Sequence, residues 1–250
     1  TITANTGYKI ESVTFSGGGL TVSGDTYTTA VLTKDESLTV KFLSKTDGVK
    51  EVTSTSEGIV VTVKSIEYVI DQIPSNIGNI IKVPMDKNTV IDDKTLAELK
   101  GKNITVILDM GTYSWRINGQ DITGSNLSSI NLGVTVGSGV KAIDEKYMNK
   151  FSKFADKTQV DLVYSGAFPF NATLTIKAPG TNNVGRYANL FYFNESTNAF
   201  EVADSCKIAS DGTATFKFKH ASKYVVAVAD KALALQDLSA GASIIDISNP

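Results

Sequence analysis

The sequence predicts a mainly β protein made of tandem antiparallel β-sandwich-like modules, with two short helices in its second region. Three observations lead to this fold class. Short apolar runs with period-two alternation recur along the chain, separated by Gly, Asn, Asp and Ser. The length of 250 residues exceeds the usual size of one domain, which is roughly 100 to 200 residues. Two segments carry the apolar spacing and end signals of helices.

Residues 1–66 are predicted to form a small β-repeat or immunoglobulin-like module. Alternating apolar residues mark strands near 2–4, 10–15 and 38–42, and Asn5-Thr6-Gly7 is expected to form the first turn. The most regular strand of this region is Gly58-Ile59-Val60-Val61-Thr62-Val63. Such alternation is typical of an antiparallel sheet with one buried face.

A larger sandwich-like region is predicted over residues 67–229. Between Ile66 and Lys82 the strand pattern weakens, and Pro74-Ser75-Asn76 is typical of a connection. We therefore place a module boundary near residue 67. Residues 230–250 are expected to form a linker or one last strand, with a slight preference for the linker.

Two short helices are expected in this second region. Residues 92–100 begin with Asp92, place Leu96 and Leu99 on one face, and are followed by Gly101, which together give helix start and stop signals. Residues 144–154 carry four apolar residues at helical spacing, namely Tyr147, Met148, Phe151 and Phe154.

Six further strands are predicted after residue 160. They are expected at residues 161–164, 172–176, 188–193, 200–202, 214–218 and 224–228. Loops with the composition of hairpin turns separate several of them, as at Asn194-Glu195-Ser196-Thr197-Asn198. A series of this kind is typical of an antiparallel sandwich.

The start of the chain resembles a known bacterial repeat. Thr1-Ile2-Thr3-Ala4, Gly7-Tyr8 and Ser12-Val13-Thr14 lead to a closing strand, Leu38-Thr39-Val40-Lys41-Phe42. This order resembles the repeat modules that occur in tandem in surface proteins of Firmicutes. The resemblance covers about the first 42 residues and implies a small β module.

A second resemblance covers residues 80–229. Its main motifs are the segment from Tyr113-Ser114-Trp115 to Ile122, the strand Ala188-Asn189-Leu190-Phe191-Tyr192-Phe193, and His220-Ala221-Ser222-Lys223-Tyr224. These motifs resemble a β-rich domain of extracellular, multi-modular Firmicutes proteins, some of which carry wall-attachment modules. The resemblance implies a structural or adhesive surface role and brings no catalytic residues with it. No wall-attachment module or sortase-type signal is found in this sequence.

The composition argues against two classes of partner. The net charge is −2, from 24 basic and 26 acidic residues, and no basic block stands out, so nucleic acid is an unexpected partner. No apolar run of 18 residues occurs, so we expect no direct membrane insertion. Cys206 is the single cysteine, which excludes an intramolecular disulfide and fits either a cytosolic protein or a secreted protein of a Gram-positive bacterium.

No catalytic, cofactor-binding or metal-binding residues are predicted. His220 is the only histidine, which removes most histidine-based triads and metal sites, and its surroundings favour a hydrogen-bonding turn residue. Paired carboxylates remain the one catalytic option. Asp161 and Glu201, on apparently neighbouring strands, are an example, although exposed strand charges explain them better.

Tyr113 and Trp115 are the candidate ligand-binding residues. On a strand they would point to the same side, which is the geometry of a sugar-stacking platform and equally that of a core. Core packing is the favoured interpretation. Further aromatic residues that a carbohydrate-binding face could use are Tyr187, Phe191, Tyr192 and Phe193.

We therefore expect a non-catalytic segment of an extracellular protein on the surface of a Gram-positive bacterium, with its signal peptide already removed. It would serve in cell adhesion or as a structural scaffold or spacer. Its partners would be a host matrix protein or a surface glycan, together with the cell wall or neighbouring modules of the same polypeptide. The alternatives are a carbohydrate-binding module of a secreted multi-domain protein and an extracellular hydrolase with paired carboxylates.

Overall fold

The structure is a computed structural model that describes residues 8–23, 26–29, 35–73, 79–137, 139–152 and 154–232. Strands contain 53% and helices 13% of the described residues, which confirms the predicted mainly β class. The expected turn at Asn5-Thr6-Gly7, the expected connection at Pro74-Ser75-Asn76 and most of the expected tail lie outside the described residues.

Two small antiparallel sheets form the N-terminal part of the protein. β1 (Tyr8–Phe15) pairs with β4 (Leu38–Ser44), and β2 (Thr21–Ser23) pairs with β3 (Thr26–Thr28). In the first pair Val13 is opposite Val40 and Phe15 is opposite Leu38, so the apolar residues share one face, as the alternation predicts. The short 3-10 helix η1 (Lys45–Gly48) then leads into the main sheet.

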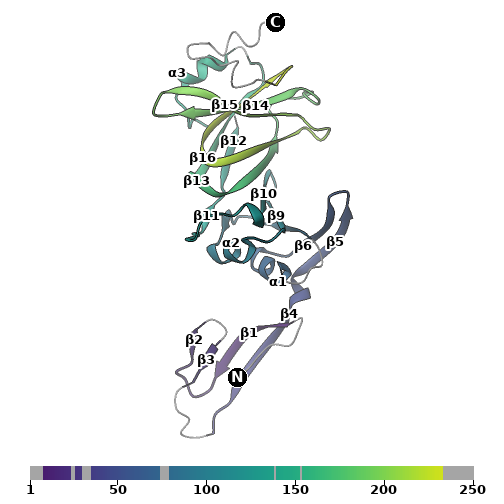
Figure 1. Ribbon diagram of the computed structural model, residues 1–250, viewed down its shortest axis with the longest axis vertical. Helices are drawn as coiled ribbons and strands as arrows, with labels where there is room; N and C mark the ends of the chain where they lie inside the picture. The colour runs from purple at the N-terminus through teal and green to yellow at the C-terminus, as the bar shows by residue number, and fades with distance from the viewer. Residues whose placement is uncertain are drawn as a thin grey trace.

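A ten-stranded sheet organises the rest of the described chain (Figure 1). Its order is β15-β14-β16-β13-β10-β9-β7-β6-β5, and β12 pairs with β13 outside this path. The strands are β5 (Val49–Thr55), β6 (Gly58–Val63), β7 (Ile80–Pro84), β9 (Thr105–Asp109), β10 (Tyr113–Asn118), β12 (Val134–Gly137), β13 (Lys157–Lys177), β14 (Tyr187–Asn194), β15 (Ala199–Lys207) and β16 (Thr213–Ala229). Beside this sheet, β8 (Val90–Ile91) pairs with β11 (Ile130–Asn131).

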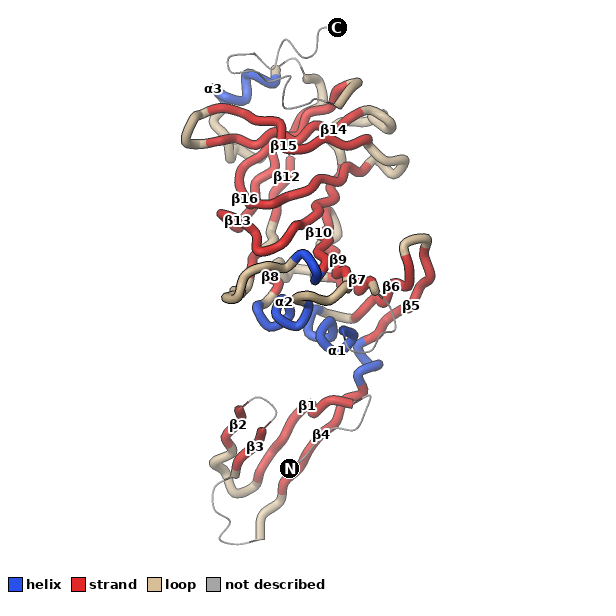
Figure 2. The backbone as a smooth tube through the Cα atoms, viewed as in Figure 1, coloured by secondary structure: helices blue, strands red, loops and turns tan. Residues whose placement is uncertain are grey.

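Two strand pairs are parallel, which the sequence did not indicate. β6 pairs with β7 and β7 pairs with β9 in parallel, whereas the other described pairs are antiparallel as expected. A parallel pair needs a crossover connection. The first crossover contains η2 (Ile66–Tyr68) and α1 (Val69–Gln72), and the second contains α2 (Asp93–Leu99). Figure 2 shows α1 and α2 side by side against this part of the sheet.

Both predicted helices are present. The side chain of Asp92 accepts a hydrogen bond from the Thr95 backbone N–H at the start of α2, and Gly101 adopts a φ of +77° just after its end. The second predicted helix consists of α3 (Glu145–Met148) and the 3-10 helix η5 (Asn149–Phe151). α1 lies in a segment whose sequence predicts a connection, so this short helix was not predicted.

Two apolar cores stabilise the main sheet. The larger core packs α1 and α2 against strands β6 to β10, among whose residues is Trp115. It also includes Leu132 and, from β16, Phe216. The smaller core places Phe151 and Phe154, which follow α3, against Phe191 and Val225 of the sheet. The helical spacing around Phe151 therefore reflects packing.

Four of the predicted strands merge into two. Residues 161–164 and 172–176 belong to β13, and residues 214–218 and 224–228 belong to β16. Their pairing shifts register between Asp161 and Gly166 and again between Ala167 and Ala172. These irregularities absorb residues that resemble turns in the sequence, so the strands bend without ending.

The main sheet continues across the predicted boundary near residue 67. β6 precedes that position and β7 follows it, yet the two strands are hydrogen-bonded neighbours. The link to the N-terminal part includes an ion pair between Lys9 Nζ and Asp71 Oδ2 at 2.5 Å. The division into modules at 1–66, 67–229 and 230–250 stays a prediction, which limited proteolysis of the purified chain can check.

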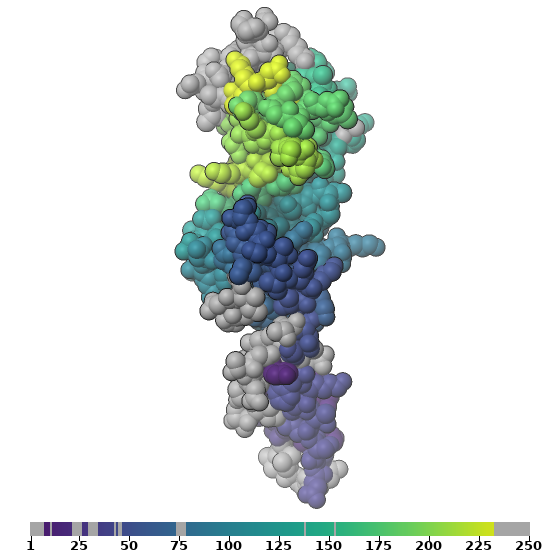
Figure 3. Space-filling view, turned by 90° about the vertical axis from the view of Figure 1, so that its right-hand side faces the viewer, coloured from purple at the N-terminus to yellow at the C-terminus, as the bar shows by residue number. Residues whose placement is uncertain are grey.

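The described chain is elongated. β1 and β4 lie at one end of the long axis, and β14, β15 and the end of β16 lie near the other (Figure 1). A view turned by 90° shows the same extended arrangement (Figure 3). The first described strands and the last one therefore lie near opposite ends of the molecule.

Candidate functional site

Trp115 lies in the core. Its side chain has 0% exposure, and its indole Nε1 donates a hydrogen bond to the Leu132 carbonyl at 2.8 Å. The ring makes edge-to-face contacts with Phe168 and Phe218, with centroid distances of 5.8 and 5.5 Å. A sugar ring therefore cannot stack on this indole in the folded protein.

Tyr113 is half-buried on the same side of β10. Its hydroxyl accepts a hydrogen bond from the Val134 backbone N–H at 3.0 Å, and burial raises its pKa above the usual value. Tyr113 and Trp115 thus share a face, as the strand spacing predicts, and that face is directed at the main core.

The other aromatic candidates are buried or, like Tyr187, half-buried. Phe191 and Phe193 have 0% and 5% exposure and belong to the smaller core. Tyr192 is half-buried and contacts the ring of His220 at 4.8 Å between centroids. These side chains do not form a flat exposed aromatic platform.

His220 lies within β16 and not at a turn. Its Nδ1 is 3.1 Å from the Tyr224 hydroxyl, which also donates to the His220 carbonyl at 2.9 Å. The expected hydrogen-bonding role is therefore present, in a bent strand. Cys206 is half-buried on β15, and burial raises the pKa of its thiol, which disfavours the reactive thiolate.

Asp161 and Glu201 are not on neighbouring strands. Asp161 lies on β13 and Glu201 on β15, and β14 and β16 separate these strands. The two strands lie three inter-strand spacings apart, about 14 Å, and the register directs Asp161 and Glu201 to opposite faces of the sheet, whereas the two carboxyl groups of a glycosidase are about 5 to 9.5 Å apart. This pair does not have the separation of a glycosidase site. Within the described residues no group of three or more His, Cys, Asp or Glu side chains could hold a metal ion.

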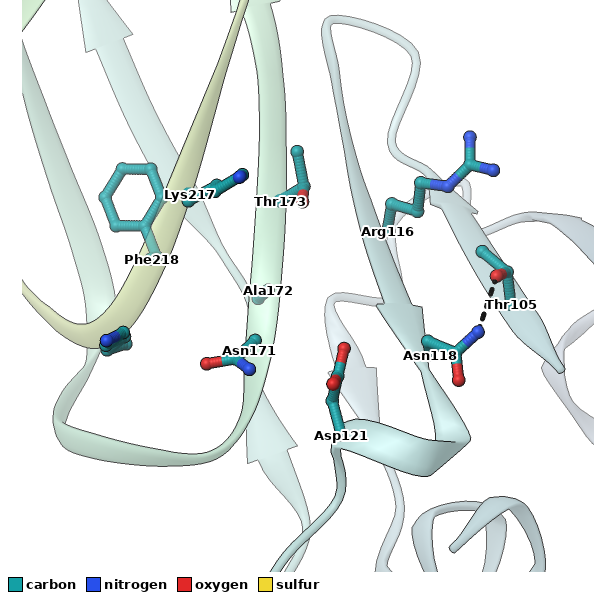
Figure 4. Close-up of a pocket in the computed structure, with 10 residues that line it drawn as sticks. Thr105, Arg116, Asn118, Asp121, Asn171, Ala172, Thr173, Lys217 and Phe218 are labelled. Carbon is teal, nitrogen blue, oxygen red and sulfur yellow. Dashed lines mark hydrogen bonds between the residues drawn. The ribbon is translucent and has the colours of Figure 1, made fainter. Parts of the chain in front are cut away.

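A polar groove lies on the sheet where β9, β10, β13 and β16 meet. Its volume is about 550 Å³, and its lining comes from these four strands and from η4 (Gly119–Asp121). The lining residues are Thr105, Arg116, Asn118, Asp121, Asn171, Ala172, Thr173, Lys217, Phe218 and Lys219 (Figure 4). Most of these side chains are polar, in contrast to the apolar residues that alternate with them along each strand.

Strand register brings the groove residues together. Arg116 is opposite Thr173, and Thr173 is opposite Lys217, so the three form one row across β10, β13 and β16. Asn118 donates from its amide to the Thr105 hydroxyl at 3.1 Å. Asn171 and Asp121 lie on opposite sides of the gap beyond this row (Figure 4). Here β10 ends and continues into η4, which opens the groove between β10 and β13.

Positive charge dominates the groove. Arg116, Lys217 and Lys219 face a single lining carboxylate, that of Asp121. Within the described part of the chain, neither Lys217 nor Lys219 forms an ion pair. Arg116 contacts Glu57 at 2.6 Å, and both side chains are well exposed. The charge of the groove is thus opposite in sign to the net charge of the chain.

A smaller cavity of about 170 Å³ uses the same sheet strands together with β7. Both of its lysines already have partners, because Lys82 Nζ lies 2.9 Å from Asp109 Oδ2 and Lys177 Nζ donates to the Asp211 backbone carbonyl at 2.6 Å. Burial raises the pKa of Asp109, but hydrogen bonds from Lys82 and from the Gly111 backbone N–H lower it by more, so the carboxyl titrates below its usual range. The larger groove is therefore the better candidate for binding an ion.

The groove is not evident from the sequence. Alternation in Ala214-Thr215-Phe216-Lys217-Phe218-Lys219 does indicate that the lysines share the face opposite the phenylalanines. It does not indicate that this face adjoins Arg116, because the two positions are about one hundred residues apart. Strand order and register decide that proximity.

In comparisons with known proteins, no protein family, curated protein or solved structure matches this chain. Among the described residues, none of the helices has both the length and the apolar character that crossing a membrane requires.

Proposed function

We propose that this chain is a non-catalytic segment of an extracellular bacterial surface protein, and that it serves in adhesion while holding neighbouring modules apart. The observation that carries the proposal is the elongated arrangement around one continuous sheet, with β1 and the end of β16 near opposite ends (Figure 1). Segments that flank such a body are kept apart by its length.

The sheet suits a spacer because its strands are linked by hydrogen bonds from β5 to β15. Two apolar cores pack against it, so relative movement of its parts would expose buried side chains. The resemblance of residues 1–42 and 80–229 to modules of Firmicutes surface proteins supports the extracellular assignment. A host matrix protein or a surface glycan is the proposed class of partner.

A carbohydrate-binding module is the second candidate, and one observation favours it. The groove on β10, β13 and β16 presents hydroxyl, amide and cationic groups to solvent. Recognition would then depend on polar contacts and not on Trp115, which has 0% exposure.

Binding and turnover should be measured together on the full chain. The purified protein is incubated with glycans, mucin, matrix proteins and bacterial wall fractions, and released products are quantified in the same samples. We expect saturable binding to at least one class without product release. Product release that grows with protein concentration would contradict the non-catalytic proposal. Small-angle scattering that gives a compact particle would contradict the spacer role.

A further inference from the structure

We propose that the groove on β10, β13 and β16 binds an acidic polysaccharide chain. This inference rests on the proposed adhesive function and names the ligand class of its surface. Arg116, Thr173 and Lys217 form one row across the groove, and Lys219 is a further lining residue on the same strand as Lys217.

The cations are available to a ligand. Lys217 and Lys219 are exposed, and within the described residues neither forms an ion pair. The nearby Asp204 carboxylate accepts a hydrogen bond from the backbone N–H of Lys217 at 2.8 Å, and not from its side-chain ammonium group. Arg116 contacts Glu57, but exposed ion pairs contribute little stability, so a ligand carboxylate can replace Glu57. The planar guanidinium can bind such a carboxylate through two parallel hydrogen bonds.

The spacing of the cations suits repeated charges. Arg116 and Lys217 are separated by two strand spacings, roughly 10 Å. Lys217 and Lys219 are two residues apart on one strand, roughly 7 Å. These are separations between Cα atoms, and the long side chains extend from them along the groove. A polymer with regularly placed acid groups can contact the cations at several of these positions at once.

Neutral hydrogen-bonding groups lie beside the cations, and Thr173 lies between Arg116 and Lys217 in the row. The side chains of Thr173 and Asn171 come from β13, and those of Thr105 and Asn118 come from the neighbouring strands (Figure 4). Amides and hydroxyls both donate and accept hydrogen bonds, as sugar hydroxyls do. A chain that carries hydroxyls between its acid groups is complementary to this pattern.

Aromatic stacking is not available in the groove. Phe218 is the aromatic lining residue, and it is only 2% exposed because it belongs to the main core. Single-stranded nucleic acids are usually held by bases stacked on aromatic side chains as well as by cations. The absence of an exposed ring among the described lining residues therefore favours an acidic polysaccharide over a nucleic acid.

The test uses the full chain and three polymers: polygalacturonate, which carries carboxylates, dextran sulfate, which carries sulfates, and neutral dextran. Binding is measured by calorimetry for the unaltered protein and for the double variant Lys217→Gln/Lys219→Gln. The matched control is Lys141→Gln/Lys150→Gln, which removes the same charge from two exposed lysines outside the groove lining. Circular dichroism of each variant reports that the fold is retained.

We expect polygalacturonate to bind and neutral dextran to leave no signal. The groove variant should bind about tenfold more weakly, because two exposed charge contacts are lost, while the control keeps most of the affinity. Raising the salt from about 0.01 M to about 1 M should weaken binding, since the Debye length falls from about 30 Å to about 3 Å. Tighter binding of dextran sulfate would identify sulfate as the preferred acid group within the same ligand class.

Three outcomes would overturn the inference. They are no binding of either acidic polymer, equal affinity of the groove variant and the control, and equal binding of neutral dextran. Each of these leaves the adhesive proposal standing if the chain still binds a matrix protein or a wall fraction. Cleavage of polygalacturonate would instead contradict the non-catalytic function on which the inference rests.

Discussion

Replacing Trp115 by Phe is expected to lower the free energy of unfolding by about 3 kcal/mol. The indole Nε1 donates to the Leu132 carbonyl at 2.8 Å, and losing this bond at a buried site costs about 1 kcal/mol. The smaller apolar area of Phe costs about 1 kcal/mol. The space left between Phe168 and Phe218 costs about 1 kcal/mol more, because a packed core relaxes only partly.

Urea unfolding followed by circular dichroism measures this change, since the substitution removes the only tryptophan. In the unaltered protein, acrylamide quenching of Trp115 fluorescence gives an independent measure of burial. Slow quenching is expected, because the indole has 0% exposure.

The matched control is Tyr187→Phe. Tyr187 is a half-buried residue of β14 whose hydroxyl forms no hydrogen bond in the described structure, so a change below about 0.5 kcal/mol is expected. If Trp115→Phe were equally mild, or if acrylamide quenched Trp115 as it quenches free indole, the assignment of this residue to the core would be refuted. A sugar-stacking role for Trp115 would then be open again.

Three further predictions concern a cap, a close approach and alkaline pH. Asp92→Ala should destabilise the protein by about 1 kcal/mol in urea unfolding, because the 2.6 Å bond to the Thr95 N–H is lost, and Asp92→Asn should restore most of it. Gly119→Ala should lower the free energy of unfolding by about 3 kcal/mol or prevent folding, since a Cβ would lie 2.1 Å from the Leu99 carbonyl oxygen. The control Gly139→Ala should be neutral, because a Cβ there would have no atom within 4 Å. Equal effects of the two substitutions would contradict the packing at η4. Burial, with a smaller effect from Tyr192, raises the pKa of Tyr224 well above its usual value. The unfolded chain therefore releases this proton first, so that stability present below about pH 10 is lost as the pH rises further. Tyr224→Phe should lose less stability between neutral and alkaline pH, and an unchanged pH dependence would argue against a raised pKa.

Local features were predictable from the sequence because they depend on neighbours in the chain. The cap at Asp92 and the stop at Gly101 need only the residues of one helix and its flanks. Alternation placed Tyr113 and Trp115 on one side of a strand, as found. Alternation cannot distinguish a core from a platform, and the burial of Trp115 followed only from the covering contacts of Leu132 and Phe168.

Long strands and parallel pairs were not predictable in the same way. Ser165-Gly166 and Pro169 resemble turn residues, but β13 accommodates them as irregularities because β16 continues alongside. The parallel pairing of β6 with β7 depends on where the crossover through α1 returns the chain, and α1 is too short to give a periodic signal.

The sequence by itself determined the mainly β class, the two helices near 92–100 and 144–154, and the side of each strand that is apolar, because hydrophobic periodicity and capping are local properties. Only the tertiary structure decided which strands are neighbours. That decision placed Arg116 in one row with Lys217, and it separated Asp161 from Glu201 by two strands. Pairing between distant strands depends on the packing of the whole chain, and so do the groove and its charge.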